Sequence, residues 1–133
     1  MNNEKLREAV WRAMELQCEI RGYAAPVDVL MGIGILSQKD YESWRFGQVR
    51  YLEEVCRCNL SKLSLVLREM RAYAQMKGLK PSLTSYVRWG KKAQGGGKEK
   101  LQFSKSGRPE IERMYATHFV DQVCIAKLEE VCV

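Results

Sequence analysis

The sequence predicts one mainly helical α+β domain with four to six helices and one antiparallel β-hairpin. Apolar residues recur at spacings of three and four within residues 4–77, which is the period of amphipathic helices. They alternate every second residue within residues 83–104, which is the period of a strand, and the helical spacing returns over residues 110–130. A length of 133 residues fits a single domain, and the 46% hydrophobic content is sufficient for a core.

The helical part divides at glycine, proline and capping residues. The first helix is expected over residues 4–21, with Gly22 as its stop. The long helix over residues 60–77 has Asn59 as a candidate N-cap and Gly78 in the C-cap position. Three shorter helical pieces are expected between them, over residues 26–31, 38–46 and 49–58.

The chain then changes period and forms the predicted hairpin. Leu83, Val87 and Trp89 lie on one side of an alternating run, and a second short run ends at residue 104. The connection over residues 90–98 contains three consecutive glycines and is expected to be flexible. A last helix is predicted over residues 110–130. Its apolar stripe would either pack within the chain or pair with a second copy of it, and consists of Val120, Cys124, Leu128 and Val131.

Positive charge is concentrated in residues 77–108. This segment contains nine Lys or Arg and one acid, Glu99, so its net charge is +8 in a chain of net +6. The other 101 residues therefore carry a net −2. Charge that is local in this way points to an anionic partner more than to general solubility.

The cysteines and the apolar runs exclude several classes of protein. Five cysteines at irregular spacing do not form a secreted disulfide framework, and Cys56-Arg57-Cys58 lacks the C-x-x-C spacing of zinc ribbons. We expect reduced, apolar cysteines, no metal and no cofactor. No apolar run approaches the roughly 18–20 residues that span a bilayer, and the N-terminus does not resemble a signal peptide. A cytoplasmic protein with no membrane partner is expected.

Several short strings of this chain carry a resemblance that covers most of its length. They resemble those of a group of small bacterial proteins with no assigned function, which implies a bacterial single-domain protein and no particular reaction. The order of helix 60–77 followed by hairpin 83–104 also resembles the helix-then-wing order of winged-helix proteins. The strings are Trp44-Arg45-Phe46-Gly47, Asn59-Leu60-Ser61-Lys62-Leu63-Ser64, Phe103-Ser104-Lys105-Ser106-Gly107 and Tyr115-Ala116-Thr117-His118-Phe119.

Nucleic-acid binding is the leading functional hypothesis. Lysines of the hairpin would neutralise phosphates, and helix 60–77 would lie along the duplex or strand. The alternative is a solvated basic loop on a protein-interaction or scaffold domain that has no enzymatic activity. The residues expected to contact DNA or RNA are Arg71, Arg88, Lys91, Lys92, Lys98, Lys100 and Lys105.

Other motifs have simpler interpretations. Tyr86 and Trp89 beside Arg88 suggest stacking on an unpaired base, although aromatic residues in strands more often pack in a core. No acid, Ser or Cys at a recognisable spacing accompanies the single histidine, His118, so no catalytic residue is assigned. The glycine run before Lys98 does not match a phosphate-binding loop, because Lys92 and Glu99 occupy positions that the motif reserves for other residues.

Overall fold

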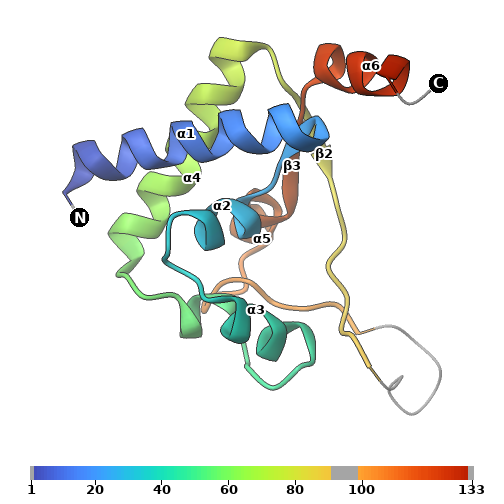
Figure 1. The fold of residues 1–133 in the computed structure, drawn as a ribbon. Helices are drawn as coiled ribbons and strands as arrows, with labels where there is room; N and C mark the ends of the chain where they lie inside the picture. Colours follow the sequence, from blue (N-terminus) through green and yellow to red (C-terminus); the bar gives the residue numbers. More distant parts are fainter. Residues whose placement is uncertain (1, 91–98, 132–133) are drawn as a thin grey trace.

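The computed structural model describes residues 2–90 and 99–131. Over these residues, six α-helices, one short 3-10 helix and three strands form a mainly helical α+β fold (Figure 1), which confirms the predicted class. No helix in this part of the chain is both long enough and apolar enough to cross a membrane.

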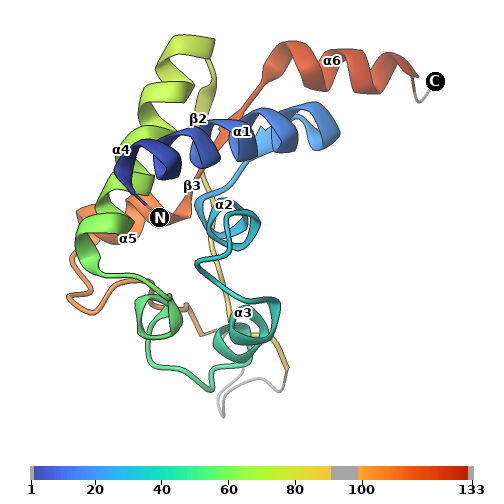
Figure 2. The same cartoon turned by 60° about the vertical axis from the view of Figure 1, so that its left-hand side comes forward.

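Two long helices, α1 (Asn3–Arg21) and α4 (Leu60–Lys77), cross each other, as both ribbon views show (Figures 1 and 2). The side chain of Asn2 caps α1 and that of Asn59 caps α4, each by accepting a hydrogen bond from a backbone N–H of the first turn. Both helices end at a glycine with positive φ, 82° at Gly22 and 68° at Gly78. The capping signals in the sequence therefore determine where these two helices begin and end.

The segment between α1 and α4 is less helical than predicted. The Ser37 side chain caps the second of its helices by accepting a hydrogen bond from the Asp40 N–H at 3.0 Å. The predicted helical piece over residues 49–58 is reduced to a 3-10 turn, because two of its N–H groups donate to carbonyls of residues 102 and 103. The elements of this segment are α2 (Pro26–Gly32), α3 (Gln38–Arg45) and η1 (Leu52–Val55).

Three short strands form an antiparallel sheet in the order β1-β3-β2. They come from distant parts of the chain, and β3 lies in the centre. Val120 of β3 is opposite both Tyr23 of β1 and Lys80 of β2. The bounds are β1 (Tyr23–Ala24), β2 (Lys80–Leu83) and β3 (Thr117–Val120).

The prediction of one helix over residues 110–130 is wrong, because β3 interrupts it. The chain forms α5 (Pro109–Ala116), then β3, then α6 (Gln122–Val131). Residues 117–120 are Thr-His-Phe-Val, whose β-branched and aromatic side chains suit a strand. Pairing with strands on both sides outweighs the local helical spacing, so Val120 belongs to β3 and not to an apolar stripe of the last helix.

The predicted hairpin over residues 83–104 is also mostly absent, because β2 pairs with β3. Leu83 is opposite Thr117 instead of a hairpin partner. The expected pairing is limited to one isolated bridge between Val87 and Lys100, with two flanking backbone hydrogen bonds. Most of the connection predicted to be flexible, residues 91–98, lies outside the described residues.

An aromatic cluster joins α3 to the segment that contains this bridge. Trp44 is fully buried, and its indole N–H donates to the carbonyl of Gln102 at 2.8 Å. Its ring centroid lies 5.1 Å from that of Phe103 and 5.7 Å from that of Tyr86. Trp44 therefore belongs to the core, and the partly buried Tyr86 packs against it.

Candidate nucleic-acid interface

One face of α4 is exposed along the whole helix while the opposite face packs into the core. The buried face includes Leu63, Val66, Met70 and Tyr73. The exposed polar residues recur at spacings of three and four, so they line up on the helix surface. We call this set the α4 stripe; it consists of Ser61, Ser64, Arg68, Arg71 and Gln75.

The α4 stripe contains no acid. Glu69, the acid within α4, is only 8% exposed and turns toward α1. Its Oε1 accepts a hydrogen bond from the indole N–H of Trp11 at 3.2 Å and lies 3.2 Å from Nε of Arg7. The exposed face of α4 therefore presents hydroxyl, guanidinium and amide groups without a carboxylate that would repel an anion.

A second group of cations lies next to the stripe, on α5 and on the loop before it. Arg71 lines one hollow together with Arg113 of α5. Ser64 lines a second hollow together with Lys105 and Arg108. Because Arg108 is ion-paired with Glu110 at 3.0 Å, the cations that converge beside α4 from separate parts of the chain are Arg71, Arg113 and Lys105.

Two carboxylates hold the loop that carries Lys105. Glu112 accepts hydrogen bonds from the backbone N–H groups of Phe103 and Ser104, both at 2.8 Å, and from the Ser104 hydroxyl at 2.6 Å. Glu53 accepts a hydrogen bond from the N–H of Lys105 at 2.9 Å. Backbone groups thus engage both acids, and the loop has a defined shape.

Tyr115 completes this support from α5. Its hydroxyl donates to Oε2 of Glu53 at 2.7 Å, and its ring stacks on that of Phe103 at a centroid distance of 5.5 Å. Burial and this hydrogen bond raise the pKa of Tyr115 well above its ordinary value, so the phenol remains a donor at neutral pH.

The residues predicted to contact nucleic acid separate into two groups. Arg71 and Lys105 lie at the α4 and α5 surface described above. Arg88 and Lys100 belong to the isolated bridge region, where Arg88 is ion-paired with Glu99 at 3.3 Å. Because side chains alternate along a strand and Lys100 is opposite Val87, the side chains of Arg88 and Lys100 point to opposite sides. Three further predicted residues, Lys91, Lys92 and Lys98, lie outside the described residues.

Arg113 is a cation of this surface that the sequence did not lead us to expect. A continuous helix over residues 110–130 gives no reason to place Arg113 beside Arg71, 42 positions earlier. The break at β3 turns α5 toward α4 and creates this proximity. The spacing of exposed residues on helix 60–77, in contrast, already marks Arg68 and Arg71 as neighbours.

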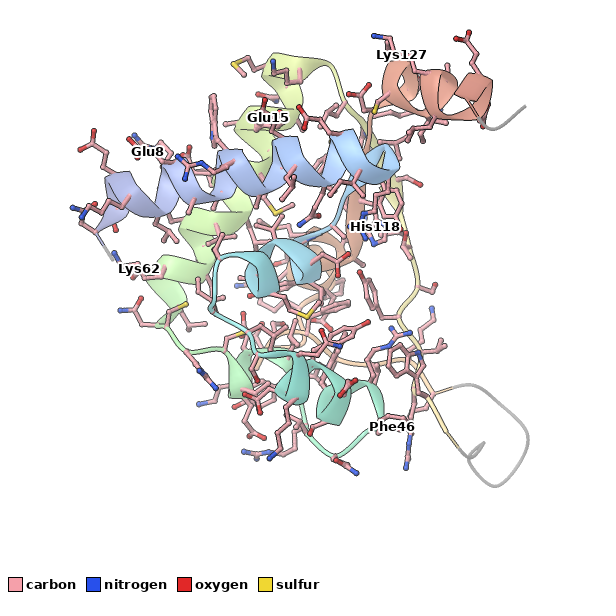
Figure 3. The ribbon with its side chains drawn as sticks, viewed as in Figure 1. Glu8, Glu15, Phe46, Lys62, His118 and Lys127 are labelled. Carbon is pink, nitrogen blue, oxygen red and sulfur yellow. The ribbon has the colours of Figure 1, made fainter. Side chains whose placement is uncertain are left out.

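A different surface carries two exposed aromatic rings. Phe46 and Trp89 are 43% and 38% exposed and meet edge to face at a centroid distance of 5.8 Å. The guanidinium of Arg45 lies 4.3 Å from the Trp89 ring centroid. Figure 3 draws Phe46 below α3, far from the α4 residue Lys62 in this view.

His118 lies in β3 within a half-buried polar cluster. Its Nε2 is 2.9 Å from the Tyr86 hydroxyl, and its ring stacks on Tyr23 with centroids 5.5 Å apart. The guanidinium of Arg21 lies 4.0 Å from the Tyr23 ring centroid and pairs with Asp28 at 2.6 Å. Burial lowers the pKa of His118, so the imidazole is neutral at pH 7 and takes the structural role that the sequence suggests.

Comparison with protein-family models, curated proteins and solved structures finds no match for this chain. Within residues 2–90 and 99–131, no three or more His, Cys, Asp or Glu side chains gather in a way that would hold a metal ion.

Proposed function

We propose that this protein binds duplex DNA, with α4 in the major groove and the cations of α5 and its preceding loop on the phosphates. The observation that carries the proposal is the exposed, acid-free α4 stripe. A helix 18 residues long with one whole face exposed has the shape that the major groove admits.

The residue types of the stripe match the hydrogen-bonding groups of base edges. Arg68 and Arg71 offer the planar donor fork that pairs with guanine, and Gln75 offers the donor and acceptor pair that suits adenine. Lys105 and Arg113, which line hollows beside the helix, would contact phosphates, and such contacts fix orientation and supply salt-dependent affinity.

The order of elements supports the same proposal. The chain continues from α4 into β2, and residues 84–116 connect β2 to β3, which pairs with it. We propose that this paired segment acts as a wing beside α4, in place of the hairpin over residues 83–104 that the sequence predicts. The basic residues Lys91, Lys92 and Lys98 belong to the connection between β2 and β3, and phosphate contacts remain their proposed role.

Two further parts of the proposal concern partners and location. Dimeric DNA-binding proteins present two recognition helices to two half-sites, and α6 is our candidate for self-association. It packs against the end of α1 and leaves Val123 67% exposed. A DNA partner fits the cytoplasmic location of the bacterial protein that the sequence suggests.

Two other functions are distinguishable from this one. The exposed pair Phe46 and Trp89 beside Arg45 has the character of a stacking platform for single-stranded nucleic acid. The second alternative is a protein-interaction or scaffold domain, in which these rings and α6 contact another chain. Each assigns binding to residues outside the α4 stripe.

Fluorescence anisotropy with labelled duplex DNA of mixed sequence, single-stranded DNA and duplex RNA tests the proposal at two salt concentrations. We expect Arg71→Gln to weaken duplex DNA binding by about tenfold, which corresponds to the loss of one base or phosphate contact. Lys105→Gln should lower the slope of log affinity against log salt by about one. Duplex RNA should bind more weakly, because its major groove does not admit a helix.

Arg12→Gln, on the exposed surface of α1, is the matched control for charge, and Trp89→Ala is the control for stacking. Both should leave duplex DNA binding unchanged. If Arg71→Gln binds as the parent does, or if Arg12→Gln weakens binding equally, α4 is not the interface. The stacking alternative would be favoured if the parent binds single-stranded but not duplex DNA and Trp89→Ala loses the single-strand binding.

A further inference from the structure

A hollow of about 320 Å³ lies where α4, α5 and the sheet meet. Its volume is at the lower end of the range in which proteins hold small molecules, roughly 300–1,000 Å³. Most of its lining is apolar and comes from α4, α5, β3 and the turn after α4. The apolar lining includes Leu67, Met70, Ala74, Leu79, Met114 and Phe119.

Two arginines also line this hollow, Arg71 from α4 and Arg113 from α5. Both are exposed, and neither side chain has an ion pair or hydrogen bond with any described residue. The acid that lines the same hollow, Glu110, is ion-paired with Arg108 at 3.0 Å. An apolar hollow is thus bordered by two guanidinium groups whose charge no described carboxylate neutralises.

We propose that this hollow binds a small amphipathic carboxylate, that is, an acid with one aliphatic or aromatic tail. The tail would displace water from the apolar lining, which is the main source of binding free energy in such a site. The carboxylate would lie between Arg71 and Arg113, since a guanidinium fork matches the two oxygens of a carboxylate. A neutral molecule of the same shape would gain no charge-assisted hydrogen bond from either guanidinium group.

The same site would couple the ligand to DNA, and this part rests on the proposed function. Arg71 belongs both to the α4 stripe and to the border of the hollow. A guanidinium engaged by a bound carboxylate is not available to a base or a phosphate. The ligand and DNA would therefore weaken each other's binding, by the same factor in each direction.

Binding is tested first without DNA, with decanoate as the probe below its micelle-forming concentration and decanol as its neutral counterpart. Methyl resonances of labelled methionine report the location, because Met70 and Met114 line the hollow whereas Met31 and Met76 do not. We expect saturable shifts at Met70 and Met114 with decanoate and affinity about tenfold lower with decanol.

The double variant Arg71→Gln/Arg113→Gln should reduce the affinity for decanoate to that for decanol. Arg68→Gln is the matched control, because Arg68 lies on the same helix but does not line this hollow. Shifts confined to Met31 or Met76, no saturable shift at all, or equal affinity of the double variant and the parent would each overturn the proposed site.

The coupling is tested by adding decanoate to the complex with labelled duplex DNA. Release of DNA by decanoate in the parent, with no release in Arg113→Gln, is the expected result. If the methionine shifts saturate but DNA stays bound, the result supports the ligand site and contradicts the proposal that the ligand regulates DNA binding. If the parent binds no DNA, the proposed function fails while the methionine titration still decides on the ligand site.

Discussion

Replacing Glu112 by glutamine tests how the loop that carries Lys105 is held beside α4. The carboxylate of Glu112 accepts three hydrogen bonds from this loop, two of them at Oε2. Glutamine keeps one oxygen, but its amide NH₂ is a donor and would face a donor of the loop. If the remaining oxygen takes the Oε2 position, the bond from the Phe103 N–H is lost; if it takes the Oε1 position, both Ser104 bonds are lost. In either orientation a buried donor remains without this acceptor.

The magnitude follows from the charge of the acceptor and from the burial of its partner. A hydrogen bond to a charged group contributes about 1.5–3 kcal/mol. Phe103 is 4% exposed and Ser104 is 1% exposed, so water does not replace the lost acceptor in either orientation. We therefore expect Glu112→Gln to lower the free energy of unfolding by about 2–4 kcal/mol and the melting temperature by about 10 °C.

Urea unfolding followed by tryptophan fluorescence measures this change. The control is Glu110→Gln, two positions earlier on the same helix, where the carboxylate pairs with exposed Arg108. That variant should change the free energy of unfolding by less than about 0.5 kcal/mol. Equal unfolding midpoints for the two variants would refute the assignment of Glu112 as the residue that holds the loop.

Three further predictions concern other parts of the fold. Gly22→Ala should destabilise the protein and expose the amides of α6 to hydrogen exchange, because φ is +82° and the new Cβ would lie 2.2 Å from Cγ1 of Ile125. Burial lowers the pKa of His118 below 6.5, so the unfolded chain binds more protons than the native protein below pH 6.5. The free energy of unfolding should therefore fall from pH 7 to pH 5. In His118→Gln, this contribution to the measured pH dependence of unfolding should disappear. Burial raises the pKa of the Cys56 thiol to about 12, so at pH 8 it should react with a disulfide reagent much more slowly in the native protein than in urea.

The bridge region and the α4 stripe differ in whether carboxylates pair with their exposed arginines. At the bridge region, Glu99 pairs with Arg88, and strand alternation turns Lys100 to the other side. At the α4 surface, Glu69 is turned inward toward Trp11, and no acid interrupts the stripe. This difference is why the proposed interface is centred on α4, whereas the density of lysines in the sequence draws attention to residues 90–105.

Local signals were sufficient for α1 and α4. Asn2 and Asn59 cap these helices, Gly22 and Gly78 end them, and these interactions involve residues within a few positions of one another. The spacing of apolar residues in helix 60–77 likewise indicated which face would be buried and which would remain for Arg68 and Arg71. Composition and periodicity therefore determined the mainly helical α+β class and one side of the candidate interface.

Only the tertiary structure decided the partners of the strands. Residues 117–120 have a helical pattern on both sides, and only pairing with β1 and β2, about 95 and 35 positions earlier, makes them a strand. That pairing ends α5 at Ala116 and brings Arg113 beside Arg71, which creates both the second group of cations and the apolar hollow. Contacts between residues that are distant in the chain stabilise this arrangement, and they produce no periodic pattern in the sequence. Neither the second group of cations nor the apolar hollow was therefore predictable from it.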